Sequence, residues 1–176
     1  TLLRILGIEL SALLPRKEIK INMAAVQEKM QNKRILITGA GGSIGSELVR
    51  LVAALHPQQL LLLDIAETPL HDVRLMLSRE YPEVDCQTVV CNICHPNRLS
   101  QLFEGFKPEI IFHAAAYKHV PMMEDNPTES ILNNVDGTVK LANLSIEHGV
   151  KTFVMVSTDK AVNPTNVMGC SKRICE

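Results

Sequence analysis

The residues best suited to chemistry lie in the segment Ser157-Thr158-Asp159-Lys160, which begins at the last residue of an apolar, β-branched run over 152–157. Such a run predicts a buried strand, so the segment lies at a strand's carboxyl end. Two hydroxyls, a carboxylate and an ammonium group are adjacent there. An Asp–Lys couple can hold the roles of proton acceptor and proton donor side by side. The alternative interpretation is an ion pair on the protein surface.

A second polar group, Tyr117-Lys118-His119, follows the predicted strand over 109–113. Three alanines separate it from His113 and leave room for a cofactor to lie against the backbone. Ligands of parallel α/β sheets bind beyond the carboxyl ends of the strands, so we expect a substrate near these three residues. Each of them alone is more often a surface residue, but three together favour a site.

A glycine-rich turn precedes both groups. It follows the short apolar run over 34–38, which is typical of a buried parallel strand. The helix predicted after it has an apolar face that we expect to pack on the sheet: Ile44, Leu48, Leu51, Val52 and Leu55. Strand, glycine turn and helix in this order predict a dinucleotide site, because the bare backbone can approach a pyrophosphate at the helix N-terminus. The spacing is G-x-x-G-x-x-G, and such turns also join strands to helices for structural reasons alone.

Asp64 ends the second predicted strand, 19 residues after Gly45. An acidic residue there accepts hydrogen bonds from the adenosine ribose diol and repels a 2′-phosphate. No Arg or Lys follows before Arg74, so NAD is favoured over NADP. The alternative is a solvated Asp at a strand end. Asn92, after the third strand, is placed either to reach the adenine edge or to cap a turn.

Strands and helices alternate from Lys33 onward, which predicts one α/β domain over 33–176: a doubly wound parallel sheet of the Rossmann type with strand order 3-2-1-4-5. Thr68 and Asn126, each followed by proline, are expected to cap helices. Residues 1–32 read as an N-terminal appendage or linker with a short helix, an extended piece and a second short helix. The expected strands are 34–38, 60–64, 86–91, 109–113 and 152–157, and the expected helices are 2–14, 23–30, 43–55, 68–80, 96–106, 127–148 and one from about 166.

Composition disfavours several classes of partner. Hydrophobic residues make up 46% of the chain and charged residues 21%, as in soluble globular proteins. A formal net charge of −1 gives no field to attract nucleic acid or anionic lipid. Five cysteines without a disulfide pattern favour a reducing cytoplasm. Cys91 and Cys94 form one C-x-x-C without a second ligand pair, so buried thiols are favoured over a metal or redox site.

Several motifs resemble the extended short-chain dehydrogenase/reductase family, and within it the membrane-tethered bacterial UDP-N-acetylglucosamine 4,6-dehydratases of capsule and O-antigen polysaccharide biosynthesis. They cover 33–176 nearly continuously. The motifs are Thr38-Gly-Ala-Gly-Gly-Ser-Ile-Gly-Ser-Glu-Leu, Leu62-Leu-Asp-Ile-Ala-Glu, His113-Ala-Ala-Ala-Tyr-Lys-His-Val-Pro-Met-Met-Glu, Asn133-Asn-Val-Asp-Gly-Thr and the segment 157–173.

The resemblance implies a reaction in which a hydride passes from C4 of the sugar to NAD+, water is lost across C5–C6, and the hydride returns to C6. Ser157 and Lys172 match the family's serine and lysine, whereas Met168 stands at the tyrosine position and cannot exchange a proton. The membrane-tethered group carries methionine there. The resemblance assigns Asp159 as the acid toward the C6 hydroxyl and Lys160 as the base at C5, with Lys172 at the nicotinamide ribose.

The same resemblance implies three sets of site residues. The catalytic set is Ser157, Thr158, Asp159, Lys160, Met168 and Lys172. The NAD-binding set is Thr38, Gly39, Gly41, Gly42, Ser43, Ile44, Gly45, Asp64, Ile65, Asn92, Ile93, Ala114, Ala115, Ala116 and Lys172. The substrate-binding set is Tyr117, Lys118, His119, Glu124 and Asn134.

The chain departs from the family pattern at Asn92, where Asp is more common, and it ends four residues after Lys172. The start at Thr1 and this end indicate a piece of a longer protein whose remainder holds much of the UDP-sugar site. We expect that protein to be a homo-oligomer at the cytoplasmic face of the inner membrane, and the piece alone to be inactive. A nucleotide-sugar 4-epimerase and a non-catalytic cofactor-binding module are the alternatives. An epimerase would keep the tyrosine and lack the Asp159–Lys160 pair.

Overall fold

The computed structural model describes residues 21–176 and contains the predicted parallel sheet. Its order is β3-β2-β1-β4-β5, which confirms the predicted topology and the Rossmann-like fold. Thr38 pairs with Leu63 on one side and with His113 on the other, so the carboxyl ends of the central strands lie at one edge. The strands are β1 (Arg34–Thr38), β2 (Gln59–Asp64), β3 (Cys86–Val90), β4 (Ile110–His113) and β5 (Thr152–Met155).

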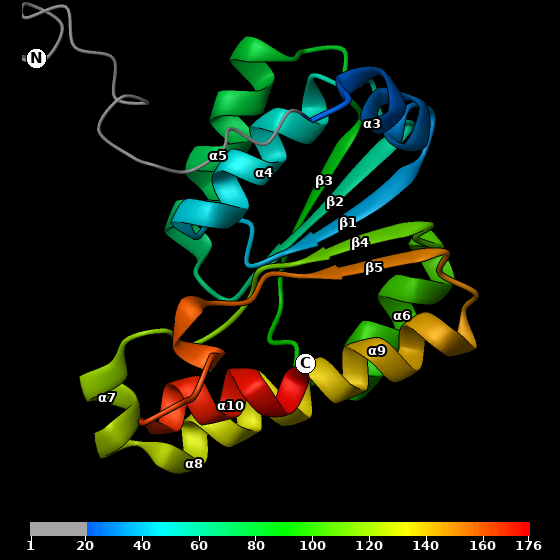
Figure 1. Cartoon of the computed structure of the whole chain (residues 1–176). Helices are drawn as coiled ribbons and strands as arrows, with labels where there is room; N and C mark the ends of the chain where they lie inside the picture. Colours follow the sequence, from blue (N-terminus) through cyan, green and yellow to red (C-terminus); the bar gives the residue numbers. More distant parts are fainter. Residues whose placement is uncertain (1–20) are drawn as a thin grey trace, which may run out of the picture.

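Helices cover both faces of the sheet (Figure 1). On one face, α4 (Ser43–Ala53) and α5 (Glu67–Glu80) pack on β1 and β2, and the end of α3 (Met23–Met30) joins them. On the other face lie α6 (Pro96–Phe106) and α9 (Gly137–Glu147). Beyond the carboxyl ends of the strands lie α7 (Val120–Asp125), α8 (Pro127–Ser130), the π-helix η1 (Ile131–Asp136), the 3-10 helix η2 (Asp159–Ala161) and α10 (Val167–Cys175).

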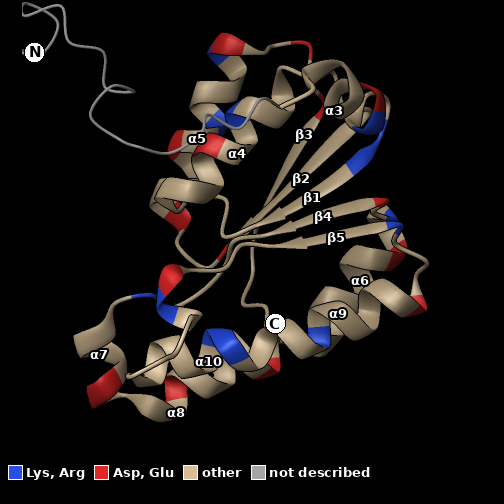
Figure 2. Ribbon diagram, in the orientation of Figure 1, with Lys and Arg blue, Asp and Glu red and all other residues tan. Residues whose placement is uncertain are grey.

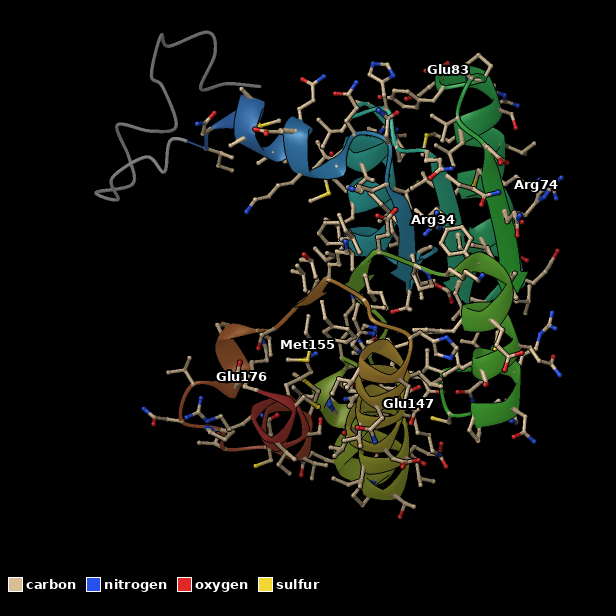
Figure 3. All side chains as sticks on the ribbon, turned by 90° about the vertical axis from the view of Figure 1, so that its right-hand side faces the viewer. Arg34, Arg74, Glu83, Glu147, Met155 and Glu176 are labelled. Atoms are coloured by element: carbon tan, nitrogen blue, oxygen red, sulfur yellow. The ribbon has the colours of Figure 1, made fainter. Side chains whose placement is uncertain are left out.

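Two aliphatic clusters form the core, one on each face of the sheet. Along β1, Ile35 and Ile37 belong to the α4–α5 cluster while Leu36 belongs to the α6–α9 cluster, as the two-residue period of a strand requires. Both faces are buried, which explains why the central strands are apolar along their length and free of charged residues except at their ends (Figure 2). On the outside of α5, Arg74 points away from the sheet (Figure 3).

The predicted packed face of α4 is wrong in part. Ile44 and Leu51 are each 54% exposed, whereas the buried residues are Gly45, Val49, Val52 and Ala53. These four follow the i, i+4, i+7, i+8 spacing of one helix face. Gly45 lies directly on the carbonyl group of Gly39, and this contact orients the helix. The expected stripe of α5, Leu70, Val73 and Leu77, is buried as predicted.

Other predicted boundaries need correction. Thr68 does not cap α5, because the helix begins at Glu67 with Ala66 at the N-cap. The Asn126 side chain donates to the Met122 carbonyl instead of capping the next helix, and α7 was not predicted. The single helix expected over 127–148 is interrupted by η1, and β5 ends at Met155, before Ser157.

Some local signals are confirmed, and one group lies outside the described residues. Asn22 caps α3 by accepting from the Ala25 N–H group at 3.2 Å, and Asn166 caps α10 by accepting from the Gly169 N–H group at 2.7 Å. The helix expected over 2–14 and most of the extended piece over 17–21 fall outside residues 21–176. Within those described residues, no helix has the length and apolar character needed to cross a membrane.

Candidate functional site

A cleft of about 490 Å³ opens at the carboxyl ends of the strands. Every strand contributes to it through the residues that follow: the glycine turn after β1, Asp64 and Ile65 after β2, Cys91 to Ile93 after β3, Ala114 to Lys118 after β4, and Val156 to Thr158 with Lys160 after β5. Met168 and Lys172 of α10 also line it. The cleft therefore lies where the topology predicts a ligand.

The structure brings most of the predicted site residues together. All of the predicted cofactor residues line the cleft except Thr38, which is fully buried behind it. All of the predicted catalytic residues line it except Asp159, whose side chain is 86% exposed beside Lys160. Of the predicted substrate residues, Tyr117 and Lys118 line the cleft. The other three do not: His119 is exposed, Glu124 accepts a hydrogen bond from the Val167 N–H group at 2.7 Å, and Asn134 is buried.

Further cleft residues were not predicted from the sequence. They are Leu63, Ala66, Pro69, Cys91, Asn133 and Val156. Most of them adjoin a strand end, and that position was the available signal for Leu63, Ala66, Cys91 and Val156. Pro69 and Asn133 belong to α5 and η1, and no local pattern in the sequence indicates that these helices reach the cleft.

The glycine turn leaves space for a ligand at one position only. Gly39 has a φ of 69°, and a Cβ there would lie 2.7 Å from the Ala115 Cα atom, so glycine is needed for both reasons. At Gly42, by contrast, the only neighbour of an added Cβ is the Gly39 carbonyl oxygen at 3.3 Å. Gly42 is the N-cap of α4 and has no side chain to cap the helix. Free N–H groups at a helix start bind phosphate, so the turn fits a pyrophosphate.

Asp64 accepts hydrogen bonds from the turn and can accept more from a ligand. Its Oδ2 atom accepts from the Gly41 N–H group at 2.8 Å and its Oδ1 atom accepts from the Ala66 N–H group at 2.9 Å. A carboxylate can accept about four hydrogen bonds, so about two positions remain for the hydroxyls of a ribose. The carboxylate thus fits a diol in the cleft while it holds the glycine turn against β2.

Asn92 and the neighbouring Cys91 and Cys94 have roles that the local structure explains. The Asn92 side-chain oxygen accepts from the Cys94 N–H group at 2.8 Å, so this residue does cap a turn, and it also lines the cleft. Burial raises the pKa of the Cys91 and Cys94 thiols, which keeps both protonated.

Within 21–176 no three His, Cys, Asp or Glu side chains are grouped to hold a metal ion.

The segment after β5 carries a connected set of polar groups. Thr158 caps η2 by accepting from the Lys160 N–H group at 3.3 Å, and its hydroxyl donates to Asp159 Oδ1 at 2.9 Å. Lys160 Nζ lies 3.3 Å from the same oxygen. The hydrogen bond from Thr158, followed by that from Lys160, lowers the pKa of Asp159. This carboxyl group is therefore ionised and paired with an ammonium group at the cleft.

Met168 and Lys172 lie on the buried side of α10. They are 2% and 5% exposed, and both line the cleft. Desolvation lowers the pKa of Lys172, while Cys175 and Glu176 oppose the effect. At the end of α10, Glu176 (Figure 3) accepts a hydrogen bond from the Ser157 hydroxyl and pairs with Arg173 at 2.9 Å. Ser157 is thus held by the helix that carries Met168 and Lys172.

Comparison with known proteins agrees with this geometry. Residues 35–176 match the family described as "Polysaccharide biosynthesis protein". The chain belongs to this family. It is 44% identical over 170 residues to the capsular polysaccharide biosynthesis protein CapD of Staphylococcus aureus, which covers 96% of the chain but 28% of CapD. The family membership predicted from the motifs is confirmed.

Two further relatives have different activities in their names. A UDP-N-acetylglucosamine 4,6-dehydratase (inverting) of Campylobacter jejuni is 32% identical over 141 residues, covering 80% of this chain and 40% of the relative. A UDP-glucose 4-epimerase of Rickettsia canadensis is 32% identical over 149 residues, covering 82% of this chain and 42% of the relative. This chain spans less than half the length of each of these relatives.

Solved structures share the fold. Pen from Bacillus thuringiensis superposes with a TM-score of 0.76 at 27% identity, covering 83% of this chain and 45% of that one. The Bordetella bronchiseptica enzyme WbmG in complex with NAD superposes with a TM-score of 0.69 at 25% identity, covering 82% of this chain and 48% of that one. The chain therefore corresponds to a little under half of each of these two proteins.

Proposed function

We propose that this chain is the NAD-binding part of a nucleotide-sugar 4,6-dehydratase that acts on a UDP-N-acetylhexosamine, with UDP-N-acetylglucosamine as the preferred substrate. The observation that carries the proposal is the composition of the cleft lining that the segment after β5 and α10 provide. Met168 occupies it in place of an ionisable residue, and the Asp159–Lys160 pair lies at its rim. Dehydration needs an acid and a base at adjacent carbons, and this pair supplies two proton-exchanging groups side by side.

The residues present fit NAD. The N–H groups at the start of α4 would hold the pyrophosphate, Asp64 the adenosine ribose, and Ile65, Asn92 and Ile93 the adenine. Ala114 to Ala116 would provide a flat wall for the nicotinamide half, with Lys172 at its ribose. NAD, when bound, accepts a hydride from the sugar and later returns it. The NAD complex of WbmG, at 25% identity, supports this choice of cofactor.

The Asp159–Lys160 pair holds one mobile proton. In the exposed site the favoured form is the carboxylate with the ammonium group, as the lowered pKa of Asp159 indicates. Movement of that proton from Lys160 Nζ to Asp159 Oδ1, 3.3 Å apart, gives a neutral carboxylic acid beside a neutral amine. Burial under a bound sugar disfavours the charged form of both groups. A bound sugar therefore lowers the cost of forming the acid that protonates the leaving C6 hydroxyl and the amine that removes the C5 proton.

The names of the relatives support a nucleotide-sugar enzyme and point to two reactions. The epimerase of Rickettsia canadensis, at 32% identity, makes a 4-epimerase the second candidate. The Asp159–Lys160 pair argues against it, because an epimerase needs no acid at C6 and no base at C5. Both reactions remove the proton of the C4 hydroxyl, which a thioether at position 168 cannot accept. The Campylobacter jejuni relative, named as a 4,6-dehydratase, supports the first candidate.

The test is to incubate the intact protein with UDP-N-acetylglucosamine in heavy water and to analyse the product by mass spectrometry and NMR. A dehydratase gives a 4-keto-6-deoxy sugar with deuterium at C5. An epimerase gives a galacto-configured sugar without deuterium. Recovery of unchanged substrate from protein that binds NAD would contradict both candidates and leave a non-catalytic cofactor-binding module.

A further inference from the structure

Six of the eight buried polar residues in the described chain belong to one hydrogen-bonded network. They are Thr38, His113, Ser130, Asn134, Thr138 and Ser171, each at most 7% exposed. Thr38 is the last residue of β1, His113 ends β4, and the others lie on α8, η1, α9 and α10. No buried side-chain nitrogen or oxygen in the described residues lacks a hydrogen-bond partner. A fully satisfied network of this kind specifies one arrangement of the elements it joins.

The direction of each hydrogen bond follows from its partners. The Thr138 hydroxyl donates to the backbone carbonyl of Asn134 at 2.5 Å, since a carbonyl can only accept. Thr138 Oγ1 must then accept from His113 Nε2, 2.9 Å away, so Nε2 carries the ring proton. In the neutral ring Nδ1 is an acceptor, and Thr38 donates to it at 2.7 Å. Burial, with the nearby charge of Lys172, lowers the pKa of His113 to about 4, so the ring is neutral at pH 7.

Asn134 extends this chain of hydrogen bonds to the cleft. Its Oδ1 atom accepts from the Tyr117 N–H group at 2.8 Å and its Nδ2 atom donates to the Tyr117 carbonyl at 2.9 Å. Nδ2 also donates to Ser171 Oγ at 3.0 Å, and Ser171 in turn donates to the Met168 carbonyl at 2.7 Å. With Asn133 donating to Oδ1 at 3.1 Å, all four positions of the amide are used.

The network therefore joins parts of the cleft that no regular element joins. Thr38, at one end of the network, directly precedes Gly39, the first glycine of the turn. At its other ends the network bonds to backbone groups of Tyr117 and Met168, and both of these residues line the cleft. The segment Ala114 to Tyr117 belongs to neither strand nor helix. It is held at one end by the Ala114 N–H group donating to the Thr38 carbonyl and at the other by the Asn134 amide.

We propose that the network from Thr38 through His113, Thr138 and Asn134 to Ser171 sets the position of α10 relative to the glycine turn, and that His113, in its Nε2–H tautomer, is a positioning residue for the reaction. The proposal rests on the function given above. The network fixes how far Met168 and Lys172 lie from a nucleotide held at the turn. A displacement of about 1 Å in such a distance is enough to slow a reaction by about 100-fold.

The first test changes Thr138, which touches neither the turn nor the cleft. Thr138→Val removes the hydroxyl with little change of shape, and Thr138→Ser keeps it as the matched control. In the intact protein we expect Thr138→Val to lower kcat about tenfold with the Kd for NAD within about threefold of the wild type, because one buried donor and one acceptor lose their partners. Thr138→Ser should stay within about threefold in both.

The second test uses the other end of the network and covers the case in which Thr138→Val does not fold. Ser171→Ala removes the link from Asn134 to the Met168 carbonyl while the His113 side remains. We expect the same fall in kcat with the Kd for NAD retained. If Thr138→Val folds and its kcat equals the wild-type value, the positioning role is overturned. If Thr138→Val does not fold, a wild-type kcat for Ser171→Ala overturns it.

The tautomer is tested without any turnover. Nitrogen-15 NMR of the histidine rings in the intact protein should show for His113 a protonated Nε2 and an unprotonated Nδ1, with the signal assigned by its loss in His113→Gln. A protonated Nδ1 at neutral pH would overturn the proposal. If the wild type binds NAD and shows this tautomer but converts no UDP-sugar, the failure lies with the proposed function and not with the network.

Discussion

Two glycines of the turn, Gly42 and Gly45, offer a pair of substitutions that separate binding from folding. Gly42 has a φ of −71° and a ψ of 164°, which any residue adopts, and an added Cβ would meet only the Gly39 carbonyl oxygen at 3.3 Å. At Gly45 an added Cβ would lie 2.7 Å from the Gly39 carbonyl carbon and closer still to its oxygen. The first methyl group would enter the cleft, and the second would enter the backbone of the turn.

The structure sets different magnitudes for the two changes. An ordinary Cβ contact is 3.4–4 Å, and no rotamer change can relieve a clash with backbone, so Gly45→Ala forces α4 away from β1. We expect a loss of about 3 kcal/mol of stability, or about 10 °C in melting temperature. For Gly42→Ala, a weaker N-cap and a less flexible unfolded chain nearly cancel, so stability should change by less than about 1 kcal/mol. NAD affinity should fall at least about tenfold, since the methyl group occupies the approach of the pyrophosphate.

The assay is thermal unfolding by calorimetry together with NAD titration, both on the intact protein. The expected outcome is a stable Gly42→Ala protein that binds NAD weakly, and a Gly45→Ala protein whose melting temperature is clearly lower without NAD. Unchanged NAD affinity in Gly42→Ala would refute the placement of the pyrophosphate at this turn. A wild-type melting temperature in Gly45→Ala would refute the account of how α4 is oriented.

Three further predictions concern the cleft and the core. Asp64→Ala should weaken NAD binding about tenfold by calorimetry, because the ribose and the Gly41 and Ala66 N–H groups lose their acceptor; unchanged affinity would remove the cofactor assignment. Asp159→Asn and Lys160→Ala should each abolish dehydration of UDP-N-acetylglucosamine while NAD titrations stay unchanged, and turnover retained in both would place the chemistry elsewhere. Because the pKa of His113 is about 4 when folded and 6.5 when exposed, the unfolded state binds more protons in this range. Acidification through it should therefore remove about 3 kcal/mol of stability in urea titrations. His113→Gln should lack this part of the pH dependence, and an identical pH profile would contradict it.

Much of the fold was predictable because its signals are local. The runs that form β1 and β2 are buried on both faces, and such strands are apolar without alternation. Helices between them require right-handed crossovers, which leave few strand orders. The glycine turn and Asp64 were found because a strand end and a helix start fix where they lie. Many of the cleft residues follow from the same rule, since they adjoin a strand's carboxyl end, whereas Pro69 and Asn133 lie on helices.

The features that were missed depend on contacts between distant parts of the chain. The interruption of the 127–148 helix is the main example: Asn134 in η1 bonds to Tyr117, 17 residues earlier, and to Ser171, 37 residues later. The spacing of apolar residues over 127–148 does not indicate either contact. The packed face of α4 was misjudged for a different reason: the nearby carbonyl group of Gly39 touches Gly45, and the apolar pattern does not indicate that contact.

Two of the three lysines that line the cleft, Lys160 and Lys172, show how environment divides the proposed roles. Lys172 is 5% exposed, its pKa is lowered by desolvation, and it has no carboxylate within 4.0 Å among the described residues. The Lys160 side chain is 49% exposed and paired with Asp159. An unpaired ammonium group in a poorly solvated site acts strongly on nearby negative charge, so Lys172 suits the oxygen at C4. A lysine already sharing a proton with a carboxylate suits the exchange at C5 and C6. Groups of one chemical type in different surroundings are thus suited to different steps, and with methionine at position 168 the proposed chemistry falls to these two lysines and Asp159.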